Sequence, residues 1–441
     1  MSYFTRPFFL LVETFWTVLP LVVLIDLLAV YLLIYKEKMD PRSFAFWIVI
    51  IIVFPFIGFA LYLIYGCTLY SATIFGKKLG RDREMGLMDD PRIKGADVPT
   101  NGNSVEFYGD AVSGGRIRED ILSAEKTIHL EIFRMDAYSN HMLLVDDLCA
   151  KASEGVDVRV LIGRGKLRNH SAVSRMKKSG VKVRTFYHRL MSMATTSLRF
   201  RNHRMLCAVD GRVAYSGEKS FVRLEGPAAT RLEARFLADW SFATGSKADP
   251  VPILEGEGGS QVQVVSSGPD MGDSMDPATQ LYVKLIKSAK SYIFMTESYL
   301  VPDENIYNFL KLAALSGVDV RVVVPRKGEH WYQYRNTVSA SRSMFDSGVR
   351  IFVTPNRVQD NIVCVDGKLV GFYMAPFDRR AMLQDFYTSL IVDSEVVARD
   401  VTEYLSDVMD GSNERMEDDY RHQGPWARIK TMASRFMMLF N

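Results

Sequence analysis

The sequence predicts an α/β protein, with a two-helix transmembrane hairpin followed by two tandem α/β sandwich halves around one cleft. Three observations support this prediction. Two long apolar stretches lie near the N-terminus, a set of landmarks occurs twice in the same order, and Val-rich strands alternate with helical stretches in each copy. The 441 residues suffice for two domains with buried cores. The predicted parts are the hairpin 1–75, a polar connector 76–105, the first half 106–248, the second half 249–412 and a tail 413–441.

The two apolar stretches are long enough to cross a bilayer as helices. Residues 8–35 are apolar apart from four polar positions, and residues 44–65 carry no charge. A bilayer core requires about 20 such residues. The short link 36–43 joins the stretches as a hairpin, and the presence of the second stretch argues against a cleaved signal peptide. Basic residues beyond residue 76 predict that the large C-terminal part lies in the cytoplasm.

The charge balance and the cysteines bear on the class of function. The formal net charge is +3, which is too small to predict a nucleic-acid partner. The four cysteines lie far apart, without the paired spacing of a metal site, and this predicts reduced thiols in buried places.

The landmarks that occur twice predict an internal duplication. Their offsets lie between 156 and 168 residues, and the order of the landmarks is the same in both copies. The pairs are 124–131 with 289–296, 155–160 with the identical 317–322, 179–183 with 347–351, and Val209-Asp210-Gly211 with Val365-Asp366-Gly367. We therefore expect two halves of one architecture.

Within each copy, the pattern is that of an α/β sandwich. Short strands alternate with helical stretches such as 141–154 and 304–316, which predicts a sheet buried between helices on both faces. Between its last two landmarks the first copy is longer by 12 residues (168 − 156), within the segment 188–200. This apolar segment either rims a lipid-binding mouth or packs as an ordinary loop.

The stretch 201–217 carries the most informative side chains. Its alternating apolar run predicts a strand that leads into a turn, with His203 at one end and Asp210 at the other. The second copy begins at Gln359 and reaches Asp366 at the equivalent turn. Because a glycine follows each aspartate, both carboxylates also suit a purely structural role, in which they hold the turn by hydrogen bonds to the backbone.

These residues, and others along nearly all of the chain, resemble the bacterial cardiolipin synthases of the phospholipase D superfamily. Residues 40–47 and 56–63 are similar to that family's N-terminal membrane hairpin. The linking segment and the opening of the second half are similar in Leu224-Glu-Gly-Pro-Ala228, Asp239-Trp240, Ser267-Gly-Pro269 and Val301-Pro-Asp-Glu304. The resemblance implies two phospholipase D-like halves and a place in the plasma membrane of a bacterium.

The resemblance also implies a chemistry. Each half of the family supplies a His-x-Lys-x4-Asp motif. One histidine attacks the phosphodiester and forms a phosphohistidine, the other protonates the leaving alkoxide, and the lysines neutralise the phosphate. In this way a phosphatidyl group passes from one phosphatidylglycerol to the hydroxyl of a second lipid. The resemblance therefore implies no metal and no cofactor.

The motifs of this chain are incomplete. His203, Asp210 and Asp366 match the family and are the predicted catalytic residues. The first lysine position is Met205, and in the second motif Gln359 and Asn361 replace the histidine and the lysine. Loss of a general acid costs about 10²- to 10⁴-fold and loss of a charge-stabilising donor about 10²- to 10³-fold. Efficient transfer by this chain alone is therefore not expected.

Neighbouring residues could compensate for the missing lysine. Arg201, Asn202 and Arg204 are the predicted phosphate-binding residues, since arginine suits a phosphate well. On an alternating strand, however, Arg204 would point away from the face that His203 and Met205 share.

Two hypotheses remain open. In the first, the protein is a pseudoenzyme that keeps a phospholipid cleft, with phosphatidyl transfer lost or strongly impaired, and it binds anionic phospholipid or pairs with an active synthase or with itself. In the second, it is an active phosphatidyltransferase that uses His203 as nucleophile, with the missing groups supplied by another residue or a partner chain. The basic amphipathic tail after Trp426 suits an anionic membrane surface or packing against the protein itself.

Overall fold

The computed structural model describes most of the two predicted halves and part of the N-terminal region. The described residues are 41–62 without Pro55, 98–109, 113–133, 141–163, 170–187, 200–246, 251–269, 277–301, 304–326, 331–358 and 360–418, together with several positions within 20–31 and 75–82. The segment 188–199, Gln359 and the tail beyond residue 418 lie outside them, as does most of the first apolar stretch. The chain divides into two compact units, one up to Phe75 and one from Gly76 onward.

The N-terminal unit contains two short helices, α2 (Pro41–Val53) and α3 (Ile57–Leu61), that pack through an edge-to-face contact of Trp47 and Tyr62. Among the described residues, no helix has both the length and the apolar character that spanning a bilayer requires. The predicted continuous helix over 44–65 is interrupted, because α2 ends at Val53 and α3 begins at Ile57. The sequence offers a reason for this interruption: a proline, residue 55, lies between the two helices, and proline lacks a helical hydrogen-bond donor and disfavours helical geometry in the residue before it.

The first half is built on one sheet. Its strand order is β2-β8-β7-β6-β3-β4-β5, with β3, β4 and β5 parallel and the other pairs antiparallel. The strands are β2 (Ser104–Tyr108), β3 (Thr127–Ile132), β4 (Asp157–Ile162), β5 (Lys182–Thr185), β6 (Leu206–Val209), β7 (Val213–Ser216) and β8 (Phe221–Glu225).

The second half repeats this plan on a second sheet. Its order is β1-β9-β15-β14-β13-β10-β11-β12-β16, and the run from β15 to β12 matches the run from β8 to β5 strand for strand. The strands are β1 (Thr100–Gly102), β9 (Gly258–Ser267), β10 (Tyr292–Thr296), β11 (Asp319–Pro325), β12 (Arg350–Thr354), β13 (Ile362–Val365), β14 (Leu369–Phe372), β15 (Tyr387–Asp393) and β16 (Asn413–Glu414). The common order confirms the duplication that the landmarks predict.

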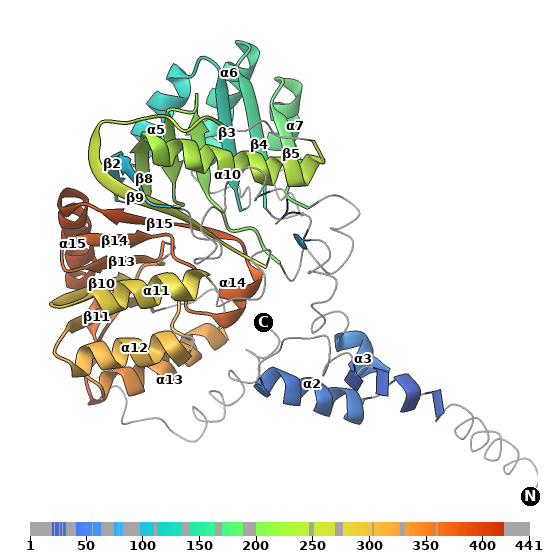
Figure 1. The fold of residues 1–441 in the computed structure, drawn as a ribbon, viewed down its shortest axis with the longest axis vertical. Helices are drawn as coiled ribbons and strands as arrows, with labels where there is room; N and C mark the ends of the chain where they lie inside the picture. The colour runs from blue at the N-terminus through green and yellow to red at the C-terminus, as the bar shows by residue number, and fades with distance from the viewer. Residues whose placement is uncertain are drawn as a thin grey trace, which may run out of the picture. The chain divides into compact units, whose positions relative to one another are not determined.

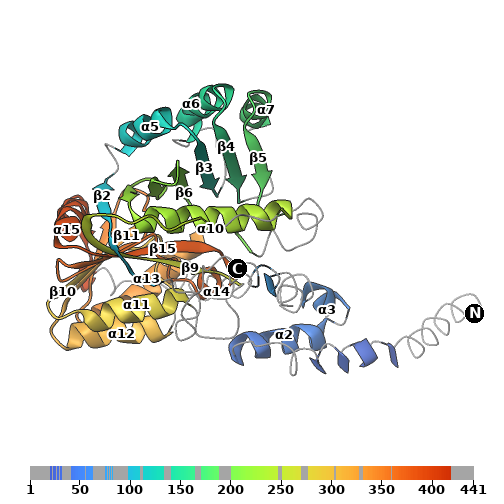
Figure 2. The same cartoon turned by 45° about the horizontal axis from the view of Figure 1, so that its top comes forward.

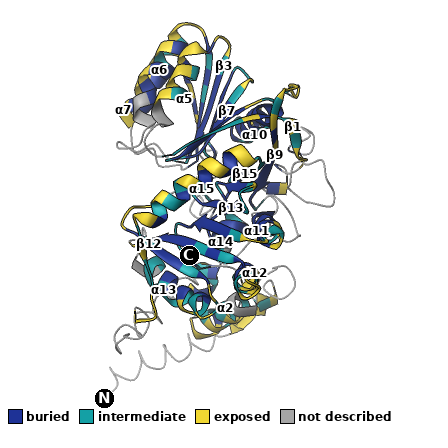
Figure 3. Ribbon diagram, turned by 90° about the vertical axis from the view of Figure 1, so that its left-hand side faces the viewer, coloured by how far each residue is buried: buried dark blue, intermediate teal, exposed yellow. Residues whose placement is uncertain are grey.

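Helices cover both faces of each sheet (Figures 1 and 2). In the first half, α5 (Ser113–Ser123), α6 (His141–Ser153) and α7 (His170–Lys178) pack on one face, and α10 (Pro227–Thr244) crosses the other. In the second half, the corresponding helices are α11 (Pro277–Ser288), α12 (Glu304–Leu315) and α13 (Trp331–Phe345), with α15 (Glu395–Asp410) on the opposite face and the short α14 (Arg379–Gln384) before β15. Figure 3 shows that the strands are buried and that exposed positions gather on the helices.

The same turn follows β6 and β13. Asp210 and Gly211 have φ angles of 52° and 68°, and Asp366 and Gly367 have 51° and 62°. Positive φ at both central residues defines the tight hairpin turn that Asp-Gly favours, because its twist matches that of the flanking strands. The Asp-Gly dipeptides therefore explain why both hairpins form at these positions.

The predicted polar connector 76–105 is partly built into the fold. Thr100–Gly102 forms β1 at the edge of the second sheet, next to β9. Lys78 and Asp82 have no exposed surface and reach charged residues of α10 in the first half. Lys78 and Asp82 are therefore structural parts of the first half, whereas Thr100–Gly102 belongs to the sheet of the second half.

Lys78 and Asp82 belong to a buried cluster of five charged side chains. Asp82 contacts Lys78 at 2.7 Å and Arg235 at 2.8 Å, and Asp239 contacts Arg235 at 2.8 Å, Lys78 at 3.1 Å and Arg204 at 2.6 Å. Burial by itself would raise the pKa of both carboxyl groups. The surrounding cations outweigh it and hold the pKa of Asp82 and of Asp239 below the ordinary value.

We expect Asp82→Ala to destabilise the protein by about 3–5 kcal/mol, because it removes one of the two carboxylates that balance the buried cations of Lys78 and Arg235. Thermal unfolding of the full chain in detergent micelles measures this loss. Arg116→Ala removes an exposed ion pair with Glu119 and is the control, with an expected change within about 0.5 kcal/mol. Equal effects of the two substitutions would show that the buried cluster has no special weight.

Candidate functional site

His203 lies where the two halves meet. Its backbone N–H donates to the carbonyl of Phe386 at 2.9 Å, and the N–H of Phe386 donates to the carbonyl of Arg201 at 2.8 Å. This parallel bridge joins the residues before β6 in the first half to the residues before β15 in the second. Two elements far apart in sequence therefore fix the histidine.

The His203 ring is held between two aromatic rings and faces a carboxylate. Phe133 stacks on one side, with ring centroids 4.0 Å apart, and Tyr387 stacks at 5.1 Å with an interplanar angle of 2°. Nε2 lies 3.5 Å from Oδ2 of Asp385, whose other oxygen accepts the backbone N–H of Arg201 at 2.9 Å. The side chain of His203 keeps 23% of its surface exposed, so the ring is both oriented and accessible.

The two lysine positions, Met205 and Asn361, make equivalent contacts in the two halves. The N–H of Phe133 donates to the sulfur of Met205 at 3.1 Å, and the N–H of Ser298 donates to Oδ1 of Asn361 at 2.9 Å. Phe133 and Ser298 are separated by 165 residues, the offset of the nearest landmark pair. A lysine ammonium is only a donor, whereas both side chains here act as acceptors. Neither position can present a cation to a phosphate.

Asn361 is also tied into the second half by its remaining groups. Its Nδ2 donates to the carbonyl of Met374 at 3.0 Å, and its Oδ1 accepts the hydroxyl of Ser298 at 2.8 Å. Only 4% of its surface is exposed. Met205 packs against the hydrophobic core of the first half. Both side chains therefore serve packing within their own half.

Asp210 and Asp366 hold the starts of neighbouring strands. The carboxylate of Asp210 accepts the backbone N–H groups of residues 125, 126 and 127 at 2.8–2.9 Å. Asp366 accepts those of residues 290, 291 and 292 at 2.7–2.8 Å. Asp210 follows β6 while His203 precedes it, so about 20 Å of strand separates the two residues. The structure does not bring these carboxylates to the histidine.

Of the predicted phosphate-binding residues, two are bonded inside the protein. Asn202 is fully buried and donates to Glu131 at 2.6 Å, and Arg204 is paired with Asp239 in the charged cluster. Burial, with Asp239 nearby, raises the pKa of Glu131 to about 8, so this carboxyl is mostly protonated at neutral pH. Arg201, two residues before His203, keeps intermediate exposure.

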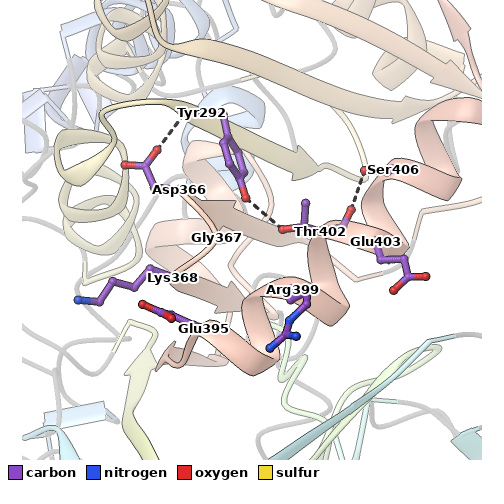
Figure 4. A pocket seen from close by; sticks show the side chains of 9 residues that line it. All are labelled: Tyr292, Asp366, Gly367, Lys368, Glu395, Arg399, Thr402, Glu403 and Ser406. Atoms are coloured by element: carbon purple, nitrogen blue, oxygen red, sulfur yellow. Dashed lines mark hydrogen bonds between the residues drawn. The ribbon is translucent and has the colours of Figure 1, made fainter.

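A hollow of about 680 Å³ lies elsewhere, on the second half (Figure 4). It is bounded by the turn after β13 and by α15, and Figure 4 shows the Tyr292 hydroxyl directed at Thr402 on its wall. Charges of both signs line it, among them Lys368, Glu395 and Arg399. His203 is not among the lining residues, so this hollow is not the predicted cleft between the halves.

Comparisons with known proteins agree with this architecture. A family model described as the PLD-like domain of cardiolipin synthase matches residues 282–409. The cardiolipin synthase of Listeria monocytogenes serotype 4a (strain HCC23) is 28% identical over 463 residues, covering 92% of this chain and 95% of its own length. That of Oceanobacillus iheyensis is 29% identical over 92% of this chain and 95% of its own length. The major cardiolipin synthase of Bacillus subtilis (strain 168) is 25% identical over 95% and 98%.

A solved structure shares the fold. The crystal structure of phosphatidylserine synthase from Haemophilus influenzae Rd KW20 superposes with a TM-score of 0.57 at 10% identity, covering 83% of this chain and all of that one. Two halves of one strand order that meet at the first motif define a duplicated protein of the phospholipase D superfamily. Within that superfamily, the chain is similar to the bacterial cardiolipin synthases over more than nine-tenths of its length.

Several residues of the site have no signal in the sequence. Asp385 and Tyr387 precede and begin β15, some 180 residues after His203, and Phe133 follows β3. Nothing in their local pattern distinguishes them from ordinary strand-end residues. The bridge between residues 202 and 386 brings Asp385 and Tyr387 to the histidine, and the pairing of β3 with β6 brings Phe133 close to it.

We expect Asp210→Asn and Asp366→Asn to lower stability at neutral pH and to do so less in acid. Burial would raise the pKa of both carboxyls, but their amide hydrogen bonds outweigh it and lower the pKa below the value of about 3.9 in unfolded chains. The stabilisation is therefore complete above that value and is lost as the pH falls through the folded pKa.

The measurement is the melting temperature of each variant and of the parent between pH 7 and pH 3. The gap should narrow below about pH 4. The exposed Asp146→Asn serves as the control for removal of an aspartate and should stay close to the parent. A gap that stays constant with pH would contradict the assigned role of the two carboxylates.

Proposed function

We propose that this protein is a membrane-associated member of the cardiolipin synthase family that binds a phosphatidylglycerol-type phospholipid between its halves, with phosphatidyl transfer lost or strongly impaired. One observation carries the proposal. At both lysine positions, the side chain accepts a hydrogen bond from an equivalent backbone amide instead of offering a cation. Since phosphate charge must be balanced in the transition state, this arrangement favours binding over catalysis.

The buried charges support the same proposal. Arg204, which could have replaced a lysine, is neutralised by Asp239 below the site. An arginine already paired in a buried place adds little positive potential where a phosphate would lie. Of the three predicted phosphate-binding residues, Arg201 alone keeps partial exposure, and one cation can help to hold an anionic lipid without completing the catalytic set.

A second candidate function is phosphatidyl transfer with His203 as nucleophile. The observation in its favour is the carboxylate of Asp385 beside Nε2, because a carboxylate can orient an imidazole. In this case the missing acid and cations would come from a partner chain, such as an active synthase or a second copy.

The membrane and partner predictions belong to this proposal. The apolar N-terminal stretches and the names of the relatives support a place at the plasma membrane of a bacterium, with the two halves in the cytoplasm. The partner would be an anionic phospholipid surface, and the small net charge gives no reason to add nucleic acid.

The deciding experiment compares cardiolipin formation from labelled phosphatidylglycerol by the full chain and by His203→Ala in detergent micelles. We expect both to stay at background while both still sediment with phosphatidylglycerol liposomes. Product that the parent makes and His203→Ala does not would establish the transferase instead.

Restoring the motif tests the cause of the impairment. We expect the triple variant Met205→Lys, Gln359→His and Asn361→Lys to raise cardiolipin formation above the parent by at least about 10²-fold, since it returns an acid and two cations. The amides of Phe133 and Ser298 lose their acceptors in this variant, so its melting temperature must be measured first. Adding His203→Ala to the triple variant should abolish the gain.

A folded triple variant that stays at background would show that the missing motif residues are not what limits transfer. The proposal would then lose its main support, because the impairment would lie elsewhere in the site.

A further inference from the structure

Three consecutive backbone amides of the first half converge on one carboxylate of the second half. The N–H groups of Glu218 and Lys219 lie 3.2 Å from the oxygens of Asp360, and that of Ser220 lies at 2.7 Å. The hydroxyl of Ser220 donates to the same carboxylate at 3.0 Å. We call these four donors the amide nest. Successive N–H groups that face one point form an anion-binding concavity.

The amide nest is held in shape by its surroundings. The carbonyl of Ser220 accepts the hydroxyl of Tyr373 at 3.0 Å, and Ser220 has no exposed surface. Gly217 begins the turn with a φ of 128°, and a Cβ at this residue would meet the carbonyl oxygen of Ser220 at 2.0 Å. Only glycine permits this approach. The four donors are therefore fixed before any ligand arrives.

The amide nest lies next to the site. The Gly217 N–H and the Ser216 hydroxyl both donate to the carbonyl of Met205, which ties this turn to the first lysine position. Asp360 immediately precedes the second lysine position, Asn361. An anion bound by the nest would thus lie between the two motif segments.

The Asp360 carboxylate, which occupies the amide nest, has hydrogen-bond donors around it but little positive charge. In the described part of the chain, Asp360 receives the hydrogen bonds of the nest but no ion pair from a lysine or arginine. Burial outweighs these hydrogen bonds and raises the pKa of Asp360, whereas the same kind of amide contact lowers the pKa of Asp210 and Asp366. Asp360 is therefore a weaker anionic occupant than the two turn carboxylates are.

Among the described residues of the second half, the turn that corresponds to the nest has no equivalent of it. At the corresponding turn, the Met374 N–H is already used by the carbonyl of Asn361, and Pro376 has no N–H. The Phe377 N–H contacts Glu297 at 3.4 Å. The duplication of the fold therefore does not account for the nest, which is particular to the first half.

We propose that the amide nest is a binding site for a phosphate oxyanion, and that the Asp360 carboxylate is an internal ligand that fills the site and keeps external phosphate out. The four donors match the needs of a tetrahedral oxyanion, which accepts several hydrogen bonds at once. The phosphate could come from a phospholipid headgroup or from free phosphate. The proposal holds whether or not the protein binds phospholipid between its halves.

The test uses the full chain in detergent micelles and compares the parent with Asp360→Ala. Melting temperatures are recorded with inorganic phosphate and with chloride at the same ionic strength. We expect phosphate to raise the melting temperature of Asp360→Ala in a saturable manner, by roughly 2–4 °C at ten times the dissociation constant. The parent should show no rise beyond that in chloride, because Asp360 occupies the nest.

Asp366→Ala is the matched control, since it also frees three backbone amides. Those amides lie at an exposed strand start, where water satisfies them, so phosphate should not stabilise this variant. No stabilisation of Asp360→Ala, or an equal rise in all three proteins, overturns the proposal. If Asp360→Ala fails to fold, Asp360→Asn replaces it, with phosphate binding followed by phosphorus NMR line broadening.

A parallel titration with glycerophosphoglycerol, a water-soluble phosphodiester headgroup, distinguishes the two sources of phosphate. Stabilisation by this compound alone assigns the nest to the headgroup, and stabilisation by inorganic phosphate assigns it to the free ion as well. Liposome sedimentation of the parent reports separately on phospholipid binding, so its failure leaves the result for the nest unaffected.

Discussion

The backbone bridge between residues 201–203 and Phe386 is the interaction on which the site depends. Two hydrogen bonds of 2.8 and 2.9 Å join the halves where the first motif begins. Because β15 continues directly from this bridge, Tyr387 stacks on His203, and Asp385 reaches its Nε2. A histidine on a free strand end would sample many orientations, whereas here the second half selects one.

Next to this junction, the cationic side chains are buried inside the protein. Arg204 follows His203 directly, yet its guanidinium pairs with Asp239 in a cluster that also holds Lys78, Asp82 and Arg235. Buried cations need carboxylate partners to offset the loss of hydration. The cations of this cluster therefore stabilise the fold and are not available to a phosphate. The cluster also explains why residues just beyond the N-terminal unit behave as part of the first half.

The two copies keep what the fold needs and differ in what chemistry needs. Asp210 and Asp366 each hold three amides of the neighbouring strand, a role that any chemistry at the other strand end leaves unaffected. The two lysine positions hold a thioether and an amide instead of an ammonium group. Each of these side chains accepts a hydrogen bond from the equivalent backbone N–H of its own half. The motif aspartates therefore say little about catalysis in this protein.

The sequence by itself determined the α/β class, the duplication and the two hairpin turns, because these follow from local periodicity, from repeated segments and from Asp-Gly chemistry. It also identified His203, Met205 and Asn361 through the family motif. Pro55 indicates a break within the second apolar stretch, but the hydropathy of that stretch, taken alone, predicts one continuous helix. The tertiary structure decided the rest. It alone joined Asp385 to His203, Asp239 to Arg204 and Asp360 to the amides of residues 218–220. The two partners of these contacts lie at least 35 positions apart in the sequence. Their contact therefore depends on tertiary packing and not on local sequence pattern.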